Sequence, residues 1–213
     1  MVHSKNTGGF TLLELMLSVA LFGSILSALG LVARQSSRFY RQSRIEQELE
    51  VQLYRGLNLM ARQLSDAGRE LVPEPDSDFG TPALTFKRCL GFDGTDKLWS
   101  SSFMLSWQLE DGELDDGLDN NGNGLADEGV IVWTENVNLP STRSVVKIHG
   151  VRELLGGETF NGADDNGNGL FDEPGLCFDI EGNVLTIFLT LETLDIDGQA
   201  INRTAQTAVR IRN

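Results

Sequence analysis

The strongest pattern in the chain is an uninterrupted apolar run from Phe10 to about Ala33. Its one ionisable side chain is Glu14, and its other polar residues are three serines and a threonine. A helix rises about 1.5 Å per residue, so this run reaches roughly 35 Å and can cross the hydrocarbon core of a bilayer. Because a carboxylate inside such a span is costly in lipid, Glu14 is a candidate functional residue.

Helical periodicity continues beyond the apolar run. Apolar side chains recur at spacings of three and four, which is typical of an amphipathic helix: they are Ile45, Leu49, Leu53, Leu57, Met60 and Leu64. No proline lies between Phe10 and Leu71, and Gly68 is suited to end the helix. We therefore expect one helix from Phe10 to Gly68, about 85 Å long. A coiled coil is the alternative interpretation, but the stripe fades after roughly three repeats, which favours packing on a sheet.

Short alternating segments fill the rest of the chain. They predict strands at residues 83–88, 102–109, 130–134, 144–149, 184–194 and 204–211. The strongest is 184–194, where Leu185, Ile187, Leu189 and Leu191 share one face. Strands without intervening helices indicate an antiparallel sheet, so the fold class is α+β with one long helix.

The junction before the apolar run carries a specific motif. A short polar leader ends in Gly8 and Gly9, and Phe10 and Glu14 follow within the apolar run. This combination resembles the class III signal of type IV pilins and type II secretion pseudopilins. A secretory signal fits less well, because its charged region should precede a shorter apolar stretch that ends in small residues. The resemblance implies a pilin-like fold, with the long N-terminal helix packed on the antiparallel sheet.

The resemblance also implies how the chain is processed. A prepilin peptidase would cut after Gly9 and methylate the new amino terminus on Phe10. Glu14 would then occupy the fifth mature position, where the family keeps a glutamate that acts in assembly. The chain would be a single-pass protein of the bacterial inner membrane with its head in the periplasm, and would then enter a pilus or pseudopilus that can reach the cell surface. Its partners would be the peptidase, the inner membrane and other pilin or pseudopilin subunits, contacted through the N-terminal helix.

These patterns divide the chain into four parts. Residues 1–9 are the leader peptide, and residues 10–33 are the transmembrane and filament-core helix. Residues 34–68 are the amphipathic half of the helix, and residues 69–213 form the globular β-rich head.

Charge is distributed unevenly around a formal net value of −14. Residues 69–213 contain 26 acidic and 10 basic side chains, so the head carries 10 − 26 = −16. An acidic surface repels phosphates, so no nucleic acid is expected as a partner. Arg34, Arg38, Arg41 and Arg44 directly follow the apolar run, and the positive-inside rule would place them in the cytoplasm. We give the leader motif more weight than this rule.

A thirteen-residue acidic segment occurs twice. Residues 116–128 read DGLDNNGNGLADE and residues 161–173 read NGADDNGNGLFDE, so nine of the thirteen positions agree at an offset of 45. In each copy Asp or Asn side chains stand at every second position and a glycine follows the third of them, which resembles calcium loops of the D-x-[DN]-x-[DN]-G type. An EF-hand would need a glutamate at the twelfth position, where this chain has Val130, so Glu128 would have to complete the shell.

The sequence therefore predicts one or two calcium ions as cofactors, bound by oxygen atoms of both segments. The candidate ligands are Asp119, Asn121, Asn123, Leu125 through its carbonyl, Asp127 and Glu128, and in the second copy Asp164, Asn166, Asn168, Leu170, Asp172 and Glu173. The alternative is a pair of plain Asn-Gly turns between strands. Magnesium would accept similar ligands but prefers rigid octahedral sites that keep several waters.

Other chemistry is sparse. Cys89 and Cys177 are candidates for a disulfide bridge in a periplasmic head, and two unbridged core thiols are the alternative. His149 is the head's one histidine, and no nucleophile motif or P-loop lysine accompanies it. The chain is not expected to be an enzyme.

The function expected from the resemblance is structural. A minor pilin or minor pseudopilin, most similar to the W-type pilins or J-type pseudopilins, would prime, cap or modulate assembly of a type IV pilus or type II secretion pseudopilus. The alternative is a membrane-anchored adhesin or binding module that depends on calcium.

Overall fold

The computed structural model describes residue 9, residues 11–68 and residues 80–211. These fall into two compact units, residues 1–44 and residues 45–213, and each unit is described by itself. One helix, α1 (Leu12–Leu64, 53 residues), contributes to both units.

In the first unit, α1 buries none of its side chains. Large apolar residues from Leu12 to Val32 are all more than half exposed, and among the described residues this is the one helix long and apolar enough to span a membrane. The serine hydroxyls of this segment bond inside the helix: those of Ser18, Ser24 and Ser27 donate to the carbonyls four residues earlier at 2.8–2.9 Å. Each hydroxyl is thus satisfied without water, as a lipid environment requires.

In the second unit, the end of α1 is part of the core. The predicted stripe is confirmed from Leu49 onward, because Leu49, Leu53, Leu57, Met60 and Leu64 are at most 4% exposed. Gly56 lies on the same face, where an added Cβ would stand 2.6 Å from Cδ1 of Ile148. The helix and the sheet therefore approach closely at a position that has no side chain.

The helix ends at Leu64, four residues before the predicted end at Gly68. After Leu64 the backbone joins the sheet region instead: Ala67 forms a bridge with Arg88, and the Gly68 N–H donates to the Lys87 carbonyl at 3.1 Å. Tertiary hydrogen bonding thus replaces the last helical turn that local sequence allowed.

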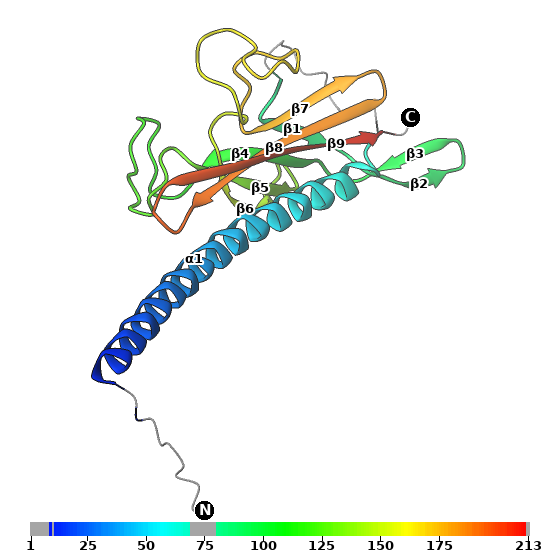
Figure 1. The fold of residues 1–213 in the computed structure, drawn as a ribbon. Helices are drawn as coiled ribbons and strands as arrows, with labels where there is room; N and C mark the ends of the chain where they lie inside the picture. The colour runs from blue at the N-terminus through cyan, green and yellow to red at the C-terminus, as the bar shows by residue number, and fades with distance from the viewer. Residues whose placement is uncertain (1–8, 10, 69–79, 212–213) are drawn as a thin grey trace, which may run out of the picture. The chain divides into compact units, whose positions relative to one another are not determined.

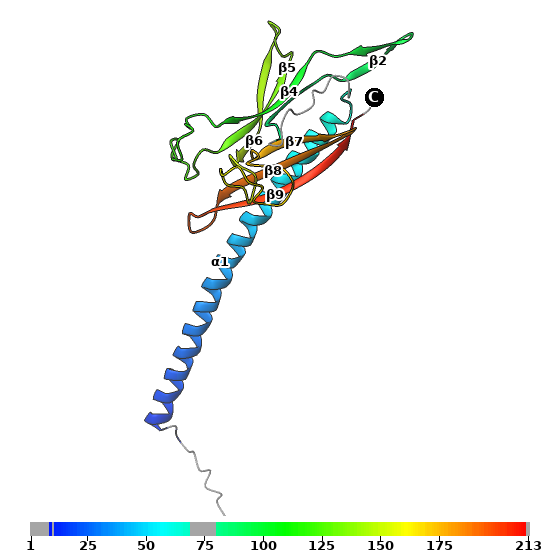
Figure 2. The same ribbon diagram turned by 90° about the horizontal axis from the view of Figure 1, so that it is seen from above.

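The sheet is antiparallel and has seven strands in the order β1-β4-β5-β6-β8-β7, with β9 paired to the other edge of β8 (Figure 1). Its strands are β1 (Ala83–Phe86), β4 (Phe103–Leu109), β5 (Gly129–Glu135), β6 (Arg143–Val151), β7 (Leu176–Glu181), β8 (Val184–Leu194) and β9 (Ala200–Arg210). A separate hairpin, β2 (Cys89–Asp93) and β3 (Asp96–Trp99), projects beside it (Figure 2).

The sheet curls so that its two ends meet. Thr81, just before β1, bridges Phe178 of β7, with the Phe178 N–H donating to the Thr81 carbonyl at 3.0 Å. The main core lies inside the curled sheet, where the buried residues of α1 pack against the strands. On β8 the predicted alternation is confirmed, because the inward-facing side chains are 0–1% exposed: Leu185, Ile187, Leu189 and Leu191. A small second cluster contains Leu155, Cys177 and Phe188, with Leu170 packed against it.

The α+β, pilin-like architecture predicted from the sequence is confirmed, and all six predicted strands are present. Three further strands, β2, β3 and β7, were not predicted. Residues 69–79, which contain Pro73 and Pro75, lie outside the described residues.

Candidate functional site

The first turn of α1 has a capping box made by Thr11 and Glu14. The Thr11 N–H and hydroxyl donate to Oε2 of Glu14 at 2.9 and 3.0 Å, and the Glu14 N–H donates to the Thr11 hydroxyl at 3.3 Å. These bonds satisfy two backbone donors that a helix N-terminus leaves open. Gly9 precedes this turn and is exposed, whereas Phe10 lies outside the described residues.

The duplicated acidic segments form two loops of the head. The first acidic loop (residues 112–128) connects β4 to β5, and the second acidic loop (residues 157–173) connects β6 to β7. The same backbone bond closes each loop: the Glu110 N–H donates to the Glu128 carbonyl at 3.0 Å, and the Leu155 N–H donates to the Glu173 carbonyl at 2.9 Å. Residues that are 45 positions apart in the two repeats therefore form equivalent hydrogen bonds.

Backbone conformation repeats between the two loops at every special position. Four glycines with positive φ recur at matching places, with φ values that agree within a few degrees: Gly112, Gly117, Gly122 and Gly124 in the first loop, and Gly157, Gly162, Gly167 and Gly169 in the second. Asp127 (φ 53°) and Asp172 (φ 45°) also adopt this left-handed region. Five residues per loop thus hold conformations that most residues avoid, which is more than a plain hairpin turn requires.

The first predicted ligand of each loop organises the turn. Oδ1 of Asp119 accepts the N–H groups of Gly122 and Asn123 at 2.6 and 3.2 Å, and its Oδ2 accepts the Gly124 N–H at 2.8 Å. Asp164 makes the same three bonds in the second loop. Each carboxylate is therefore surrounded by backbone donors inside the turn.

The two asparagines of each loop converge on its last glutamate. The side-chain NH2 groups of Asn121 and Asn123 donate to Oε1 of Glu128 at 2.8 and 2.5 Å. Asn166 donates in the same way to Glu173 at 2.8 Å, and Asn168 also bonds this oxygen. Glu128 and Glu173 are 0% exposed, so the structure places the predicted closing residue next to both alternating asparagines.

The predicted ninth ligands lie at the neck of each loop. The carboxylate of Asp127 accepts the N–H groups of Asp116 and Gly117 at 3.1 and 2.7 Å, and Asp172 accepts those of Asn161 and Gly162 at 3.0 and 2.8 Å. Leu125 and Leu170 donate their N–H groups to Asn123 and Asn168, at 2.9 and 2.8 Å.

Sequence reasoning missed one buried glutamate in each loop. Glu113 (7% exposed) accepts the Asn121 N–H at 2.8 Å, and Glu158 (1% exposed) accepts the Asn166 N–H at 2.9 Å. The signal was present in the sequence, because Gly112-Glu113 and Gly157-Glu158 extend the repeat upstream at the same offset. In each loop two glutamates therefore contact one asparagine, one at its backbone and one at its side chain.

Three of these buried carboxylate oxygens have no hydrogen-bond partner among the described residues: Oε2 of Glu128, of Glu158 and of Glu173. The described residues contain no group of three or more His, Cys, Asp or Glu side chains gathered to hold a metal. Calcium also accepts amide and carbonyl oxygens, so these would have to complete any calcium site at the loops. Buried unpaired carboxylate oxygens fit such an ion, because an isolated buried charge is unfavourable.

Negative charge accumulates around the first loop. The pKa of Glu192, on β8, is raised to about 7 by burial and by the charges of Glu128 and Glu153, although Arg152 opposes the shift. The pKa of Glu153 is also raised, by burial first and then by Asp115 and Asp127. Negative charges within the first loop therefore raise the pKa values of these two carboxyl groups outside it.

Cys89 and Cys177 do not form the disulfide bridge considered from the sequence, since both thiols are free. Cys89 is exposed on β2, whereas Cys177 is buried on β7 in the second core cluster. Burial, followed by the charge of Glu173, raises the pKa of the Cys177 thiol to about 12. The alternative of two unbridged core thiols fits Cys177 alone, because Cys89 is exposed.

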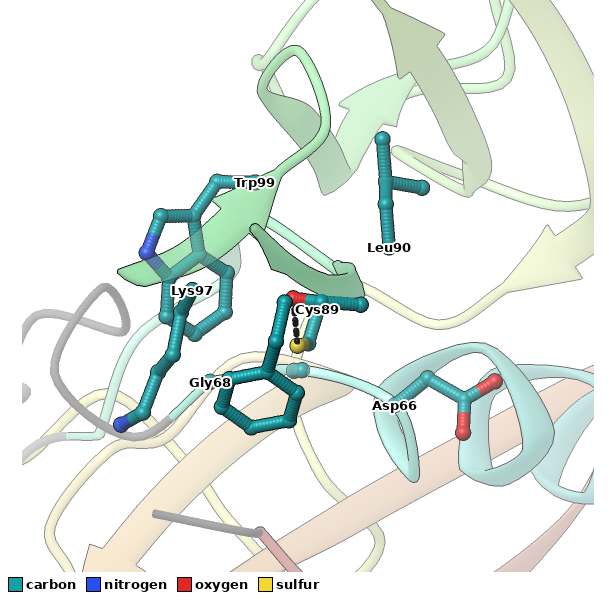
Figure 3. A pocket seen from close by; sticks show the side chains of 9 residues that line it. Asp66, Gly68, Cys89, Leu90, Lys97 and Trp99 are labelled. Atoms are coloured by element: carbon teal, nitrogen blue, oxygen red, sulfur yellow. Dashed lines mark hydrogen bonds between the residues drawn. The ribbon is translucent and has the colours of Figure 1, made fainter. Parts of the chain in front are cut away.

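A cavity of about 340 Å³ lies between the end of α1 and the β2–β3 hairpin (Figure 3). Its lining includes Asp66, Cys89, Lys97 and Trp99, and the Lys97 ammonium lies 5.8 Å from the Trp99 ring centre. His149 lies elsewhere and bonds Oε1 of Glu110 through Nδ1 at 2.7 Å. The cavity and the histidine thus present no shared catalytic arrangement among the described residues.

Comparison with known proteins identifies the N-terminal segment. Residues 4–30 match the model of the prokaryotic N-terminal methylation motif, and this segment includes Gly9, Phe10 and Glu14. Searches of curated proteins and of solved structures gave no significant match. The motif and the apolar first half of α1 support a membrane-anchored, type IV pilin-like or pseudopilin-like protein. A prepilin-type motif of this kind implies processing by a prepilin peptidase and assembly with pilin subunits.

Proposed function

We propose that the chain is a minor pilin or minor pseudopilin that primes, caps or modulates a type IV pilus or type II secretion pseudopilus. The observation that carries this proposal is the continuity of α1. The methylation motif opens the helix, and the same helix ends as a buried stripe in the head. This arrangement suits a subunit whose N-terminal helix packs among other subunits while its head is displayed outside the membrane. The chain would therefore be anchored in the inner membrane with its head in the periplasm before it is assembled.

The two acidic loops support a minor rather than a major role. They occupy residues 112–128 and 157–173, which a head built only from the sheet and the helix would not need. Major subunits of the family are commonly smaller and lack inserts of this kind. Within the minor subunits, we propose that the chain is most similar to the W-type pilins or the J-type pseudopilins.

We further propose that calcium stabilises the head by binding the two loops. Support comes from the repeated backbone, from the asparagines that converge on Glu128 and Glu173, and from the unpartnered oxygens of these glutamates. An ion of charge +2 would neutralise carboxylates that the fold removes from water.

Quantitative mass spectrometry of filaments sheared or purified from cells tests the minor role. The chain should be present at a small fraction of the major subunit's abundance, and its loss should reduce the number of filaments. Abundance equal to the major subunit would contradict the minor role. Absence from filaments and pseudopili, with normal assembly in a deletion strain, would contradict a filament function altogether.

A further inference from the structure

The two acidic loops repeat in backbone but differ in the state of their first glutamate. Both oxygens of Glu113 accept backbone N–H groups, from Asn121 at 2.8 Å and from Asn120 at 3.4 Å. Oε1 of Glu158 accepts the Asn166 N–H, whereas its Oε2 is buried and has no hydrogen-bond partner among the described residues. The second loop therefore has two unpartnered buried carboxylate oxygens, on Glu158 and Glu173, and the first loop has one, on Glu128.

Glu158 and Glu173 are held to the same pair of residues. The Leu155 backbone connects them on one side, because its N–H donates to the Glu173 carbonyl and its carbonyl accepts the Glu158 N–H at 3.0 Å. On the other side, Asn166 connects them through its backbone N–H and its side-chain NH2. The Leu155 side chain is 2% exposed in the second core cluster, which fixes this arrangement to the sheet.

The charges of this pair have no cationic partner within the described residues. The guanidinium of Arg152 donates to the Leu155 carbonyl at 3.2 Å, and among the described residues no hydrogen bond joins it to either carboxylate. The amide NH2 groups of Asn166 and Asn168 both bond Oε1 of Glu173, so partial positive charge reaches one oxygen of the pair. Two buried carboxylates without a counter-charge are unfavourable unless a cation or a proton joins them.

We propose that Glu158 is a ligand of a divalent oxygen-binding cation, calcium by preference, and that the second acidic loop is consequently the stronger of the two cation sites. This rests on the proposed calcium-stabilised head and adds a ligand that the loop motif does not include. The number of charged ligands tunes calcium affinity, so two free carboxylate oxygens at the second loop bind more tightly than one at the first. Glu113, with both oxygens bonded to the backbone, positions the first loop instead.

The test uses the full chain in detergent, stripped with chelator and titrated with calcium, with bound metal measured by elemental analysis. Wild-type protein should show two classes of site. Glu158→Gln keeps an oxygen for the Asn166 N–H but removes the charge, and should raise the Kd of the tighter class at least about tenfold. Glu113→Gln is the matched variant at the repeat-equivalent position and should leave the tighter class unchanged. Glu181→Gln, on the exposed end of β7, controls for net charge.

Melting temperature separates a ligand from a merely structural glutamate. In excess chelator, Glu158→Gln should melt at the same temperature as wild type or higher, because a buried unpaired charge is gone. In calcium it should melt lower than wild type. A lower melting temperature in chelator would overturn the proposal, since Glu158 would then support the fold without metal.

Terbium provides a readout of the first loop in the same samples. The indole ring of Trp107 lies against Gly129, the residue after Glu128: a Cβ added to Gly129 would lie 2.3 Å from Nε1 of Trp107. A tryptophan that can transfer excitation energy to terbium therefore lies beside the first loop. Terbium luminescence excited through Trp107 should be retained in Glu158→Gln, which shows that the head is folded. Loss of that signal would place Glu158 in the fold rather than in the second site and would overturn the proposal.

The outcomes distinguish this inference from the proposed function on which it rests. Wild-type protein that binds no calcium overturns both. Wild-type protein that binds two ions, with Glu158→Gln unchanged or with Glu113→Gln losing the tighter class instead, overturns the inference alone.

Discussion

Thr11 and Glu14 cap the first turn of α1 reciprocally, so the glutamate that the methylation motif provides has a local structural partner. A capping box accepts glutamine at this position as well as glutamate. The cap therefore needs an acceptor at residue 14, whereas an ion pair with the amino terminus of a neighbouring subunit, which we propose as the role of Glu14 in assembly, would need a negative charge. One substitution can separate these two roles.

We predict that Glu14→Gln keeps membrane insertion and helix start but strongly reduces incorporation into filaments. Removing one partner of a buried ion pair costs about 3–5 kcal/mol, whereas loss of an N-cap costs about 1 kcal/mol. Thr11→Val is the matched control, because it removes the two hydroxyl bonds of the cap and keeps both the charge of Glu14 and the Thr11 N–H bond to it. The measurement is the amount of each variant in membranes and in sheared filaments. Normal incorporation of Glu14→Gln would leave the charge without a role in assembly.

Cleavage between Gly9 and Phe10 is the second prediction. Mass spectrometry of membrane-extracted protein should find a methylated amino terminus on Phe10. Gly9→Leu should leave the leader attached, because a bulky residue stands where the motif has glycine. An intact Met1 in wild-type protein, or a cut within the apolar run, would contradict the processing that the motif implies.

Calcium removal should destabilise the head. At calcium a hundredfold above its Kd, binding to the folded state contributes about 2.7 kcal/mol, which corresponds to a melting-temperature shift of roughly 5–10 °C for a domain of this size. The double variant Asp119→Asn with Asp164→Asn should lose most of this shift. Asparagine keeps the acceptor for the two N–H groups bonded to Oδ1 but loses the acceptor for the N–H group bonded to Oδ2, so the variant is compared with itself in calcium and in chelator to separate the calcium response from weakening of the turn.

Asp195→Asn is the control for that experiment, since Oδ1 of Asp195 also accepts two backbone N–H groups, in the turn between β8 and β9. It should leave the calcium response unchanged. Equal melting temperatures of wild-type protein in calcium and in chelator would reduce both loops to turns.

The two thiols should react at very different rates. At pH 8 a thiol with a pKa of about 12 is ionised to a fraction of about 10⁻⁴, and the thiolate is the reactive form. Iodoacetamide should therefore label exposed Cys89 in the native chain and label Cys177 only after unfolding. Peptide mapping gives the result, and equal labelling of both in the native state would contradict the buried position of Cys177.

Glu192 should make the head less stable as pH rises. Its pKa is raised in the folded state to about 7, against an ordinary value of 4.5, so the folded chain binds this proton more tightly than the unfolded chain. The stabilising contribution is complete at pH below about 4.5 and is lost as pH rises through about 7. Glu192→Gln should raise the melting temperature, measured in chelator, more at pH 8 than at pH 5. Glu181→Gln should show no such difference.

The sequence predicted the fold where periodicity was long and one face was buried. Leu49 to Leu64 and the inward face of β8 are examples, because burial of one face imposes a repeat. The β2–β3 hairpin was not predicted, since Leu90 and Phe92 of β2 are both about two-thirds exposed and the positions of β2 do not alternate in burial. Strand β7 was not predicted because its three buried residues are consecutive, so buried and exposed positions do not alternate along it.

The candidate site was predicted only as far as a linear motif reaches. The alternating asparagines and the last glutamate of each loop were found, but Glu113 and Glu158 lie outside the thirteen-residue repeat. Their contact with Asn121 and Asn166 depends on how the loop folds back on its own entry. The early end of α1 depends likewise on Lys87 and Arg88, which are distant in sequence.

The closing bond at the neck of each acidic loop has a consequence for how such heads evolve. One backbone hydrogen bond, from Glu110 or from Leu155, separates the loop from the strands that carry it. Among the described residues, no side chain of the first loop belongs to either core cluster, so that loop could be shortened or replaced while the strands beyond its closing bond keep their register, whereas the second loop packs Leu170 against the second cluster. Under the calcium binding that we propose, such a head could thus lose the cation dependence of its first loop while the N-terminal helix stays the same.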